Sequence, residues 1–215
     1  MDLLQNKGAV IFDFDGTLYN KKNIALKLIL SSPFQMLRMK AERTARKHFK
    51  GKYFGSGDEF FRAFYNELSL LTNMSPEKAC KWYKNFYLPQ MVKILKKHYC
   101  AYEGVEQIFK GLRRDNIKIA VFSDYSFVSQ KMEAIGLDTS LVDIIQNAED
   151  CGGLKPASKP FLALAKELQV EPQNILVVGD RDDTDGEGAR QSKMAFAHIT
   201  QETPLATYFS QYLPS

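Results

Sequence analysis

The sequence predicts an α/β fold: a core built on a parallel β-sheet, with a block of helices inserted into it. Short apolar runs alternate with helical patterns at both ends of the chain. Such alternation is typical of a parallel sheet that is covered by helices on both faces. Residues 20–100 show helical patterns only, and they hold 17 basic against 5 acidic residues, whereas the rest holds 12 against 20. This uneven charge indicates two units with different tasks.

Apolar runs of strand length mark the expected sheet. These runs lie at Ala9–Phe12, Lys118–Phe122, Val142–Ile145, Ile175–Val178 and Ala195–Ile199. The first run ends where acidic residues and a glycine follow it. Helices are expected between them, over 103–115, 126–136, 158–169 and 185–193. Because ligands bind at the carboxyl ends of the strands in such sheets, polar residues that directly follow a strand are the candidates for function.

Apolar residues at helical spacing organise the insert at residues 20–100. Two helices are expected on either side of a proline break, over Asn23–Leu30 and, with a dense basic face, over Phe34–Phe49. After a glycine-rich break, further helices are expected over Asp58–Leu71, from Ser75-Pro76 to about Leu88, and from Pro89 to His98.

Composition limits the class of protein. The 215 residues, 45% of them hydrophobic, suffice for one large core or for a core with a small second domain. The sequence contains neither a signal-peptide pattern nor an apolar run near the roughly 18 residues that a membrane helix needs, so we expect a cytoplasmic protein without a membrane span. Cys80, Cys100 and Cys151 lack metal-ligand spacing and suit reduced thiols.

Two carboxylates follow the first expected strand. Asp13 and Asp15 lie in the sequence Ile11-Phe12-Asp13-Phe14-Asp15-Gly16-Thr17-Leu18. Carboxylates one residue apart at the end of a buried strand repel each other and are costly to bury. A divalent cation would offset this repulsion and would make one of the acids a directed nucleophile.

A second acidic cluster follows the strand expected at Ile175–Val178. The sequence Gly179-Asp180-Arg181-Asp182-Asp183-Thr184-Asp185 places four acids within six positions. Oxygen ligands of this kind suit Mg²⁺. Asp180 directly follows the strand and is the expected ligand beside Asp13, whereas Asp182 and Asp183 could be solvated loop charges. The positions of glycine and glutamate that an EF-hand requires are absent.

Four motifs, in this order, resemble the haloacid dehalogenase (HAD) superfamily. They are Asp13-Phe14-Asp15-Gly16-Thr17, Ser123-Asp124, Lys155-Pro156, and Gly179-Asp180 to Asp185. The resemblance implies a Rossmann-like core formed by residues 1–19 and 101–215, and a mobile α-helical cap domain at residues 20–100. Lys159 also precedes a proline, but only Lys155 lies six residues before Phe161, as the family pattern requires.

The resemblance also implies catalytic roles. Asp13 corresponds to the nucleophile that forms an aspartyl-phosphate, and Asp15 to the general acid and base. Dehalogenases of the superfamily lack this second acid, so its presence favours phosphoryl transfer. Ser123 is expected to hydrogen-bond a phosphoryl oxygen, and Lys155 to offset charge on Asp13 and on the transferred group.

Metal and substrate contacts follow from the same resemblance. The metal ligands would be Asp13, Asp180 and, through its backbone carbonyl, Asp15, while Asp185 would orient Lys155 or a metal-bound water. Substrate-binding candidates also include Thr17, whose hydroxyl could instead cap the turn, and Asp124, which could instead cap a helix.

The predicted function is therefore that of a Mg²⁺-dependent phosphatase, a hydrolase of phosphoric monoesters that acts on a small phosphorylated metabolite. A sugar phosphomutase of the same superfamily would carry the same motifs. A third possibility is a non-enzymatic binding module, since basic and aromatic residues interleave from Arg43 to Phe54 in a pattern compatible with nucleic acid or an anionic membrane. Nucleic acid is the less favoured partner, because ordinary cap helices are often rich in lysine and a pure binder has no need of a costly carboxylate cluster.

Overall fold

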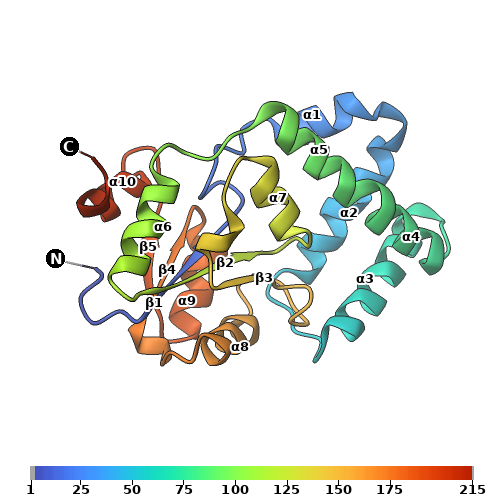
Figure 1. Cartoon of the computed structure of the whole chain (residues 1–215). Coiled ribbons are helices and arrows are strands. Elements are labelled where there is room, and N and C mark those ends of the chain that lie inside the picture. The colour runs from blue at the N-terminus through green and yellow to red at the C-terminus, as the bar shows by residue number, and fades with distance from the viewer. Residues whose placement is uncertain (1–2, 215) are drawn as a thin grey trace.

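The core is a five-stranded parallel sheet in a computed structural model that describes residues 3–214 (Figure 1). The strands are β1 (Ala9–Asp13), β2 (Lys118–Ser123), β3 (Ile144–Asn147), β4 (Ile175–Gly179) and β5 (Ala195–His198), in the order β3-β2-β1-β4-β5. The central strand β1 pairs in parallel with β2 and with β4, which brings their carboxyl ends to one edge. The predicted α/β class with a Rossmann-like core is confirmed.

Both faces of the sheet are buried because successive side chains of a strand point to opposite sides. In β1, Val10 and Phe12 join one apolar cluster, and Ala9 and Ile11 join another. The first cluster includes residues of α6 (Val105–Arg114), α7 (Val128–Ala134) and α10 (Leu205–Phe209), and the second includes residues of α8 (Ser158–Leu168) and α9 (Glu187–Gln191). These helices cover the two faces and hold the strand ends in fixed positions.

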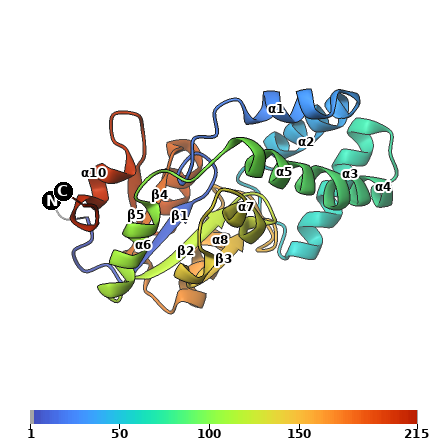
Figure 2. The same cartoon turned by 45° about the horizontal axis from the view of Figure 1, so that its top comes forward.

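The inserted helices pack around an apolar cluster of their own, to one side of the sheet (Figures 1 and 2). They are α1 (Ile24–Ser31), α2 (Met36–Phe49), α3 (Gly57–Thr72), α4 (Pro76–Trp82) and α5 (Leu88–His98). In this cluster the rings of Phe60 and Phe64 stack with their centroids 5.7 Å apart. On this packing we propose residues 20–100 as a separate cap domain, with the remainder as the core domain.

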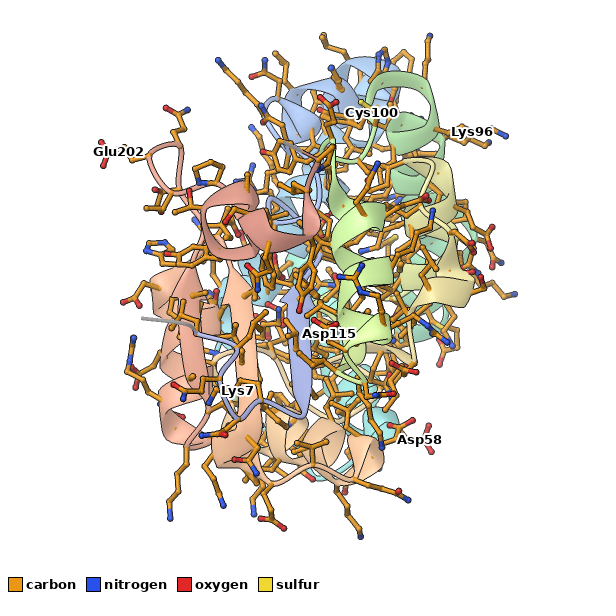
Figure 3. All side chains as sticks on the ribbon, turned by 60° about the vertical axis from the view of Figure 1, so that its left-hand side comes forward. Lys7, Asp58, Lys96, Cys100, Asp115 and Glu202 are labelled. Atoms are coloured by element: carbon orange, nitrogen blue, oxygen red, sulfur yellow. The ribbon has the colours of Figure 1, made fainter. Side chains whose placement is uncertain are left out.

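Charged side chains of both parts point into solvent. Lys96 near the end of α5, Asp58 in α3 and Glu202 near the carboxyl terminus all extend away from the ribbon (Figure 3). Within residues 3–214, each helix is too short or too polar to cross a membrane.

Two elements differ from the sequence prediction. The strand expected at 142–145 lies at Ile144–Asn147, because its pairing with β2 continues into the polar residues Gln146 and Asn147. The two helices expected on either side of Pro89 are continuous, with a π-helical turn at Tyr83–Tyr87 between α4 and α5. A wider turn before a proline accommodates the missing N–H donor and relieves the clash of the ring with the preceding turn.

The cap contacts the core through a buried ion pair, an exposed ion pair and backbone hydrogen bonds between residues 51–54 and 152–155. Arg46 of α2 lies 2.6 Å from Glu149 of the core through Nη2, and its Nη1 donates to the Asp124 carbonyl oxygen at 3.0 Å. Arg46 also pairs with Glu42 within α2, and Lys50 pairs with Asp183 of the core. In the basic and aromatic run at Arg43–Phe54, Arg46 and Phe49 are thus buried, whereas Lys47, His48 and Lys50 are exposed.

Candidate active site

Asp13 ends β1 at the centre of the sheet edge. Its Oδ1 accepts a hydrogen bond from Lys155 Nζ at 2.7 Å, and its Oδ2 accepts one from the Thr17 hydroxyl at 2.9 Å. The turn after it needs glycine at position 16, where φ is 99° and a Cβ would overlap the Asp180 carboxylate. Burial and the nearby Asp185 raise the pKa of Asp13 to about 6, although Lys155 opposes this shift.

Lys155 connects two of the buried carboxylates. Its Nζ donates to Asp13 Oδ1 at 2.7 Å, to Asp185 Oδ1 at 2.8 Å and to the Phe122 carbonyl oxygen at 2.8 Å. Burial alone would lower the pKa of Lys155, but Asp13 and Asp185 outweigh it and raise the pKa above its usual value. Asp124 fixes the backbone of the segment that carries Lys155, because its Oδ1 accepts a hydrogen bond from the Lys155 backbone N–H at 2.9 Å.

Asp15 is surrounded by donors. Its Oδ1 accepts from the Tyr19 hydroxyl at 2.6 Å, and its Oδ2 accepts from Ser123 Oγ at 3.1 Å and from Lys131 Nζ at 3.4 Å. Burial would raise the pKa of Asp15, but the Lys131 ammonium and the hydroxyl donors outweigh burial and lower the pKa. Asp15 is therefore held as the carboxylate at neutral pH.

Three carboxylates of the site lie close enough to share a cation. Oxygens of Asp13, Asp180 and Asp185 all lie within 4.8 Å of one another. Asp180 Oδ1 is buried and has no hydrogen-bond partner among the described residues. Burial and Asp13 raise the pKa of Asp180, so its charge is incompletely offset. An orphaned carboxylate oxygen within a set of hard oxygen donors fits Mg²⁺.

A lysine ammonium already contacts this oxygen-lined position. Lys21 Nζ donates to the Asp15 backbone carbonyl at 2.8 Å and lies 2.6 Å from Asp180 Oδ2. These two oxygens belong to the residues that the sequence nominates, together with Asp13, as metal ligands. Lys21 therefore offsets part of the negative charge of the site.

Some sequence-predicted residues lie elsewhere than expected. Thr17 and Ser123 are fully buried behind the two aspartates, and they contact Asp13 and Asp15 instead of lining a cavity. Asp124 does not cap α7, which begins after Phe127 without a side-chain cap. By contrast, Asp185 pairs with Lys155, one of the two roles expected of it, and Asp182 is exposed, as a solvated loop charge would be, and pairs with Arg190.

Sequence reasoning missed Lys131, Tyr19 and Lys21. Lys131 is fully buried between Asp15 and Ser123, where its Nζ donates to Ser123 Oγ at 3.1 Å. Its position was a usable signal, because it lies on the apolar stripe of α7, three residues after Val128 and four before Ile135. Tyr19 and Lys21 lie in an irregular segment and carry no comparable signal.

A cavity of about 500 Å³ opens above these groups, between the sheet edge and the cap. Its core side includes Asp13, Asp15, Asp124, Asp180 and Lys155. Its cap side is formed by residues of α1, α2 and α5, by Tyr87 of the π-helical turn, and by Lys21 and Asn23 before α1. The aspartates and Lys155 are thus accessible to a ligand of small-molecule size.

The chain is similar in sequence to several characterised or named proteins. The chain is 27% identical over 178 residues to phosphoglycolate phosphatase of Aquifex aeolicus. The matched residues make up 80% of this chain and 76% of that protein. It is 26% identical over 174 residues to SUPPRESSOR OF QUENCHING 1, a chloroplastic protein of Arabidopsis thaliana. The match to the plant protein covers 80% of this chain but only 16% of that protein's length.

Solved structures share the fold. β-Phosphoglucomutase of Clostridium difficile superposes with a TM-score of 0.65 and 20% identity, over 94% of this chain and 88% of that one. L-2-haloacid dehalogenase of Xanthobacter autotrophicus gives a TM-score of 0.60 and 19% identity, over 92% and 80%. At this level of identity the likeness concerns the fold alone.

The family assignment rests on a longer match. The family model described as haloacid dehalogenase-like hydrolase matches residues 10–199, which include every element of the sheet except the first residue of β1. All four sequence motifs lie within this range. The chain belongs to the haloacid dehalogenase-like hydrolase family.

Proposed function

We propose that this hydrolase is a Mg²⁺-dependent phosphatase that cleaves phosphoric monoesters of a small metabolite through an aspartyl-phosphate. The observation that carries the proposal is the pairing of two differently held carboxylates at one cavity. Asp13 lies beside Asp180 and its orphaned oxygen, and Asp15 lies two residues later among three donors. This arrangement supports attack by Asp13 and proton exchange by Asp15.

In the first step an oxygen of Asp13 attacks phosphorus, and the bond from phosphorus to the ester oxygen breaks. Thr17 and Lys155 orient the Asp13 carboxylate, and Lys155 also offsets the charge on the transferred group. Mg²⁺ held by Asp13, Asp180 and the Asp15 carbonyl would supply a positive charge that offsets the carboxylates and the phosphoryl oxygens. Asp185 keeps Lys155 in place.

Asp15 moves the protons of both steps. A dianionic phosphate next to Asp15 raises its pKa, which counteracts the effect of Lys131 and lets Asp15 bind a proton for the departing alcohol. In the second step the Asp15 carboxylate takes a proton from water, which attacks phosphorus and releases Asp13 and inorganic phosphate. Ser123 and Tyr19 orient the Asp15 carboxylate in both forms.

Release of inorganic phosphate from p-nitrophenyl phosphate tests the proposal. Turnover is expected with Mg²⁺ and is expected to cease when EDTA removes the metal. Metal-independent turnover, or no turnover of this ester or of any other phosphomonoester, would refute it.

The phosphomutase alternative has less support. A mutase must hold a sugar through its hydroxyl groups while excluding water. The cap side of this cavity offers Asn23, Lys40 and Arg43 as polar groups and is otherwise largely apolar. Isomer formation from a sugar phosphate without release of inorganic phosphate would identify a mutase.

Binding of Mg²⁺ is expected to weaken in acid. Protons compete with the metal for Asp13, whose pKa is raised to about 6, first by burial and then by Asp185. Below that pH the apparent affinity should fall by up to about tenfold per pH unit. Calorimetric titration with Mg²⁺ at pH 7.5 and at pH 5.0 measures the change. Equal dissociation constants at the two pH values would contradict this use of Asp13.

Lys21→Ala is expected to tighten Mg²⁺ binding by about tenfold, because it removes a like charge a few ångströms from the ligands. The wild-type ammonium must leave Asp180 Oδ2 and the Asp15 carbonyl before a metal ion can use them. Calorimetric titration measures this without any turnover. The matched control is Lys22→Ala, since the Lys22 side chain is exposed. An unchanged or weaker affinity in Lys21→Ala would show that the ammonium does not compete.

A further inference from the structure

The cap side of the active-site cavity includes an apolar wall, beside the polar side chains of Lys21, Asn23, Lys40 and Arg43. Three cap helices contribute apolar side chains to it, namely Ile24, Ala25, Leu28, Ile29, Met39 and Met91. The hydroxyl of Tyr87, which also lines it, is already used in a hydrogen bond to Glu42 Oε2 at 2.9 Å. In the part of the chain that the structure describes, no acidic side chain of the cap faces the cavity. This wall favours a ligand that buries hydrocarbon against it, because its side chains offer few hydrogen bonds to ligand hydroxyl groups.

Two cations of α2 line the same cavity. Lys40 and Arg43 are exposed, and within residues 3–214 neither side chain makes an ion pair or a hydrogen bond. Their neighbours along the helix differ in this respect, since Arg38 donates to Gln35 and Arg46 pairs with Glu42 and Glu149. Lys40 and Arg43 are thus available to a negatively charged ligand.

The catalytic groups, the apolar wall and the two unpaired cations of α2 all line one cavity. A cavity of about 500 Å³ is of the size that holds a ligand of many non-hydrogen atoms. A two-carbon ester such as phosphoglycolate, bound through its phosphate, would leave most of the apolar wall uncovered. The geometry therefore favours a longer molecule.

Resting on the proposed phosphatase function, we propose that the substrate is a phosphomonoester of an extended, mainly apolar alcohol with a second anionic group at its far end. The phosphate lies over Asp13, the carbon chain lies against the wall of α1, Met39 and Met91, and the distal anion meets Lys40 and Arg43. A carboxylate and a second phosphate share this chemistry, and both are included in the test.

Two matched series of esters test the proposal. One consists of straight-chain alkyl phosphates with two to eight carbons, and the other of the same chains ending in a carboxylate, with phosphoglycolate as its two-carbon member. Bisphosphates of the longer chains form a third arm. The measured quantity is kcat/KM for phosphate release. We expect an increase of about fourfold for each added methylene until the cavity is filled. A distal anion should add about tenfold in the long chains.

Variants connect the effects to the residues. Met39→Gln is expected to flatten the dependence on chain length. Lys40→Gln and Arg43→Gln are each expected to reduce the ratio of kcat/KM for a carboxyalkyl ester to that for the alkyl ester of the same length. Lys47→Gln is the matched control, because Lys47 is an exposed residue of the same helix outside the cavity lining.

The outcomes separate this proposal from the proposed function. If the short esters react and kcat/KM is flat or falls with chain length, the substrate proposal is wrong and the phosphatase function stands. If length matters but the distal anion does not, the role of Lys40 and Arg43 is wrong. If no ester of any series releases phosphate, the phosphatase function fails and the substrate proposal fails with it.

Discussion

Asp13→Asn is expected to reduce the rate of phosphate release by at least about 10⁴-fold, because it removes the carboxylate oxygen that would attack phosphorus. The amide is nearly the same size, so the Thr17 hydroxyl keeps a partner and the turn at Gly16 is unchanged. The assay is p-nitrophenyl phosphate hydrolysis at saturating Mg²⁺, with circular dichroism to check folding. Asp182→Asn is the matched control, since Asp182 is an exposed acid of the second acidic cluster that pairs with Arg190.

A covalent intermediate gives a second readout. Asp15→Asn keeps the nucleophile but removes the acid of the first step and the base of the second. Because p-nitrophenol can leave without a proton, phosphate should accumulate on Asp13 after rapid mixing with p-nitrophenyl phosphate. Mass spectrometry of peptides that contain residue 13 would detect the added phosphoryl group. Full activity of Asp13→Asn, or a phosphoryl group on another residue, would overturn the assignment of the nucleophile.

Lys155→Met is expected to lower the free energy of unfolding by about 3–5 kcal/mol at pH 7.5 in EDTA, in addition to abolishing activity. Lys155 is 3% exposed, and its removal leaves Asp13 and Asp185 close together without the cation between them. Urea denaturation followed by fluorescence measures the loss. Lys159→Met is the control, since Lys159 also precedes a proline but is exposed on α8.

The loss should depend on pH in a defined direction. Burial raises the pKa of Asp13 and of Asp185, and Lys155 lowers both. Without Lys155 both pKa values rise further. A carboxyl with a raised pKa in the folded state contributes stability at low pH and loses it as pH rises through that pKa. The difference between wild type and Lys155→Met should therefore be smaller at pH 5.0 than at pH 7.5. An equal difference at both values would mean that packing, not charge, explains the effect.

The sheet and the position of the first aspartates could be predicted because their causes are local. Strands that are buried on both faces are continuous apolar runs, and a run of this kind ends at the acid that follows it. Asp13 and Asp180 were found in this way, since each lies at or directly after the end of such a strand. β3 was misplaced by two residues because its pairing with β2, rather than its own apolarity, sets its end.

Contacts made across long sequence separations could not be predicted. Lys131 approaches Asp15 from 116 residues away, and Arg46 meets Glu149 from 103 residues away. In the sequence, Arg46 contributes to the basic excess of residues 20–100, and such an excess is equally compatible with a solvated surface. The burial of Arg46 depends on how α2 packs against the core, and no local sequence pattern specifies this packing. The burial of Thr17 and Ser123 behind the aspartates depends likewise on packing between elements.

Besides backbone hydrogen bonds such as that from the Phe54 N–H to the Gly152 carbonyl oxygen at 2.7 Å, the buried pair between Arg46 and Glu149 joins the proposed cap to the core. Each partner belongs to a different part, and each has a second partner on its own side. Arg46 retains Glu42 within α2, and Glu149 Oε2 retains the Ser126 backbone N–H at 2.8 Å and the Ser126 hydroxyl at 2.5 Å. Separation therefore leaves neither charge stranded, which avoids the large penalty of an uncompensated buried ion. We therefore expect this pair to hold the proposed cap against the core without preventing its separation.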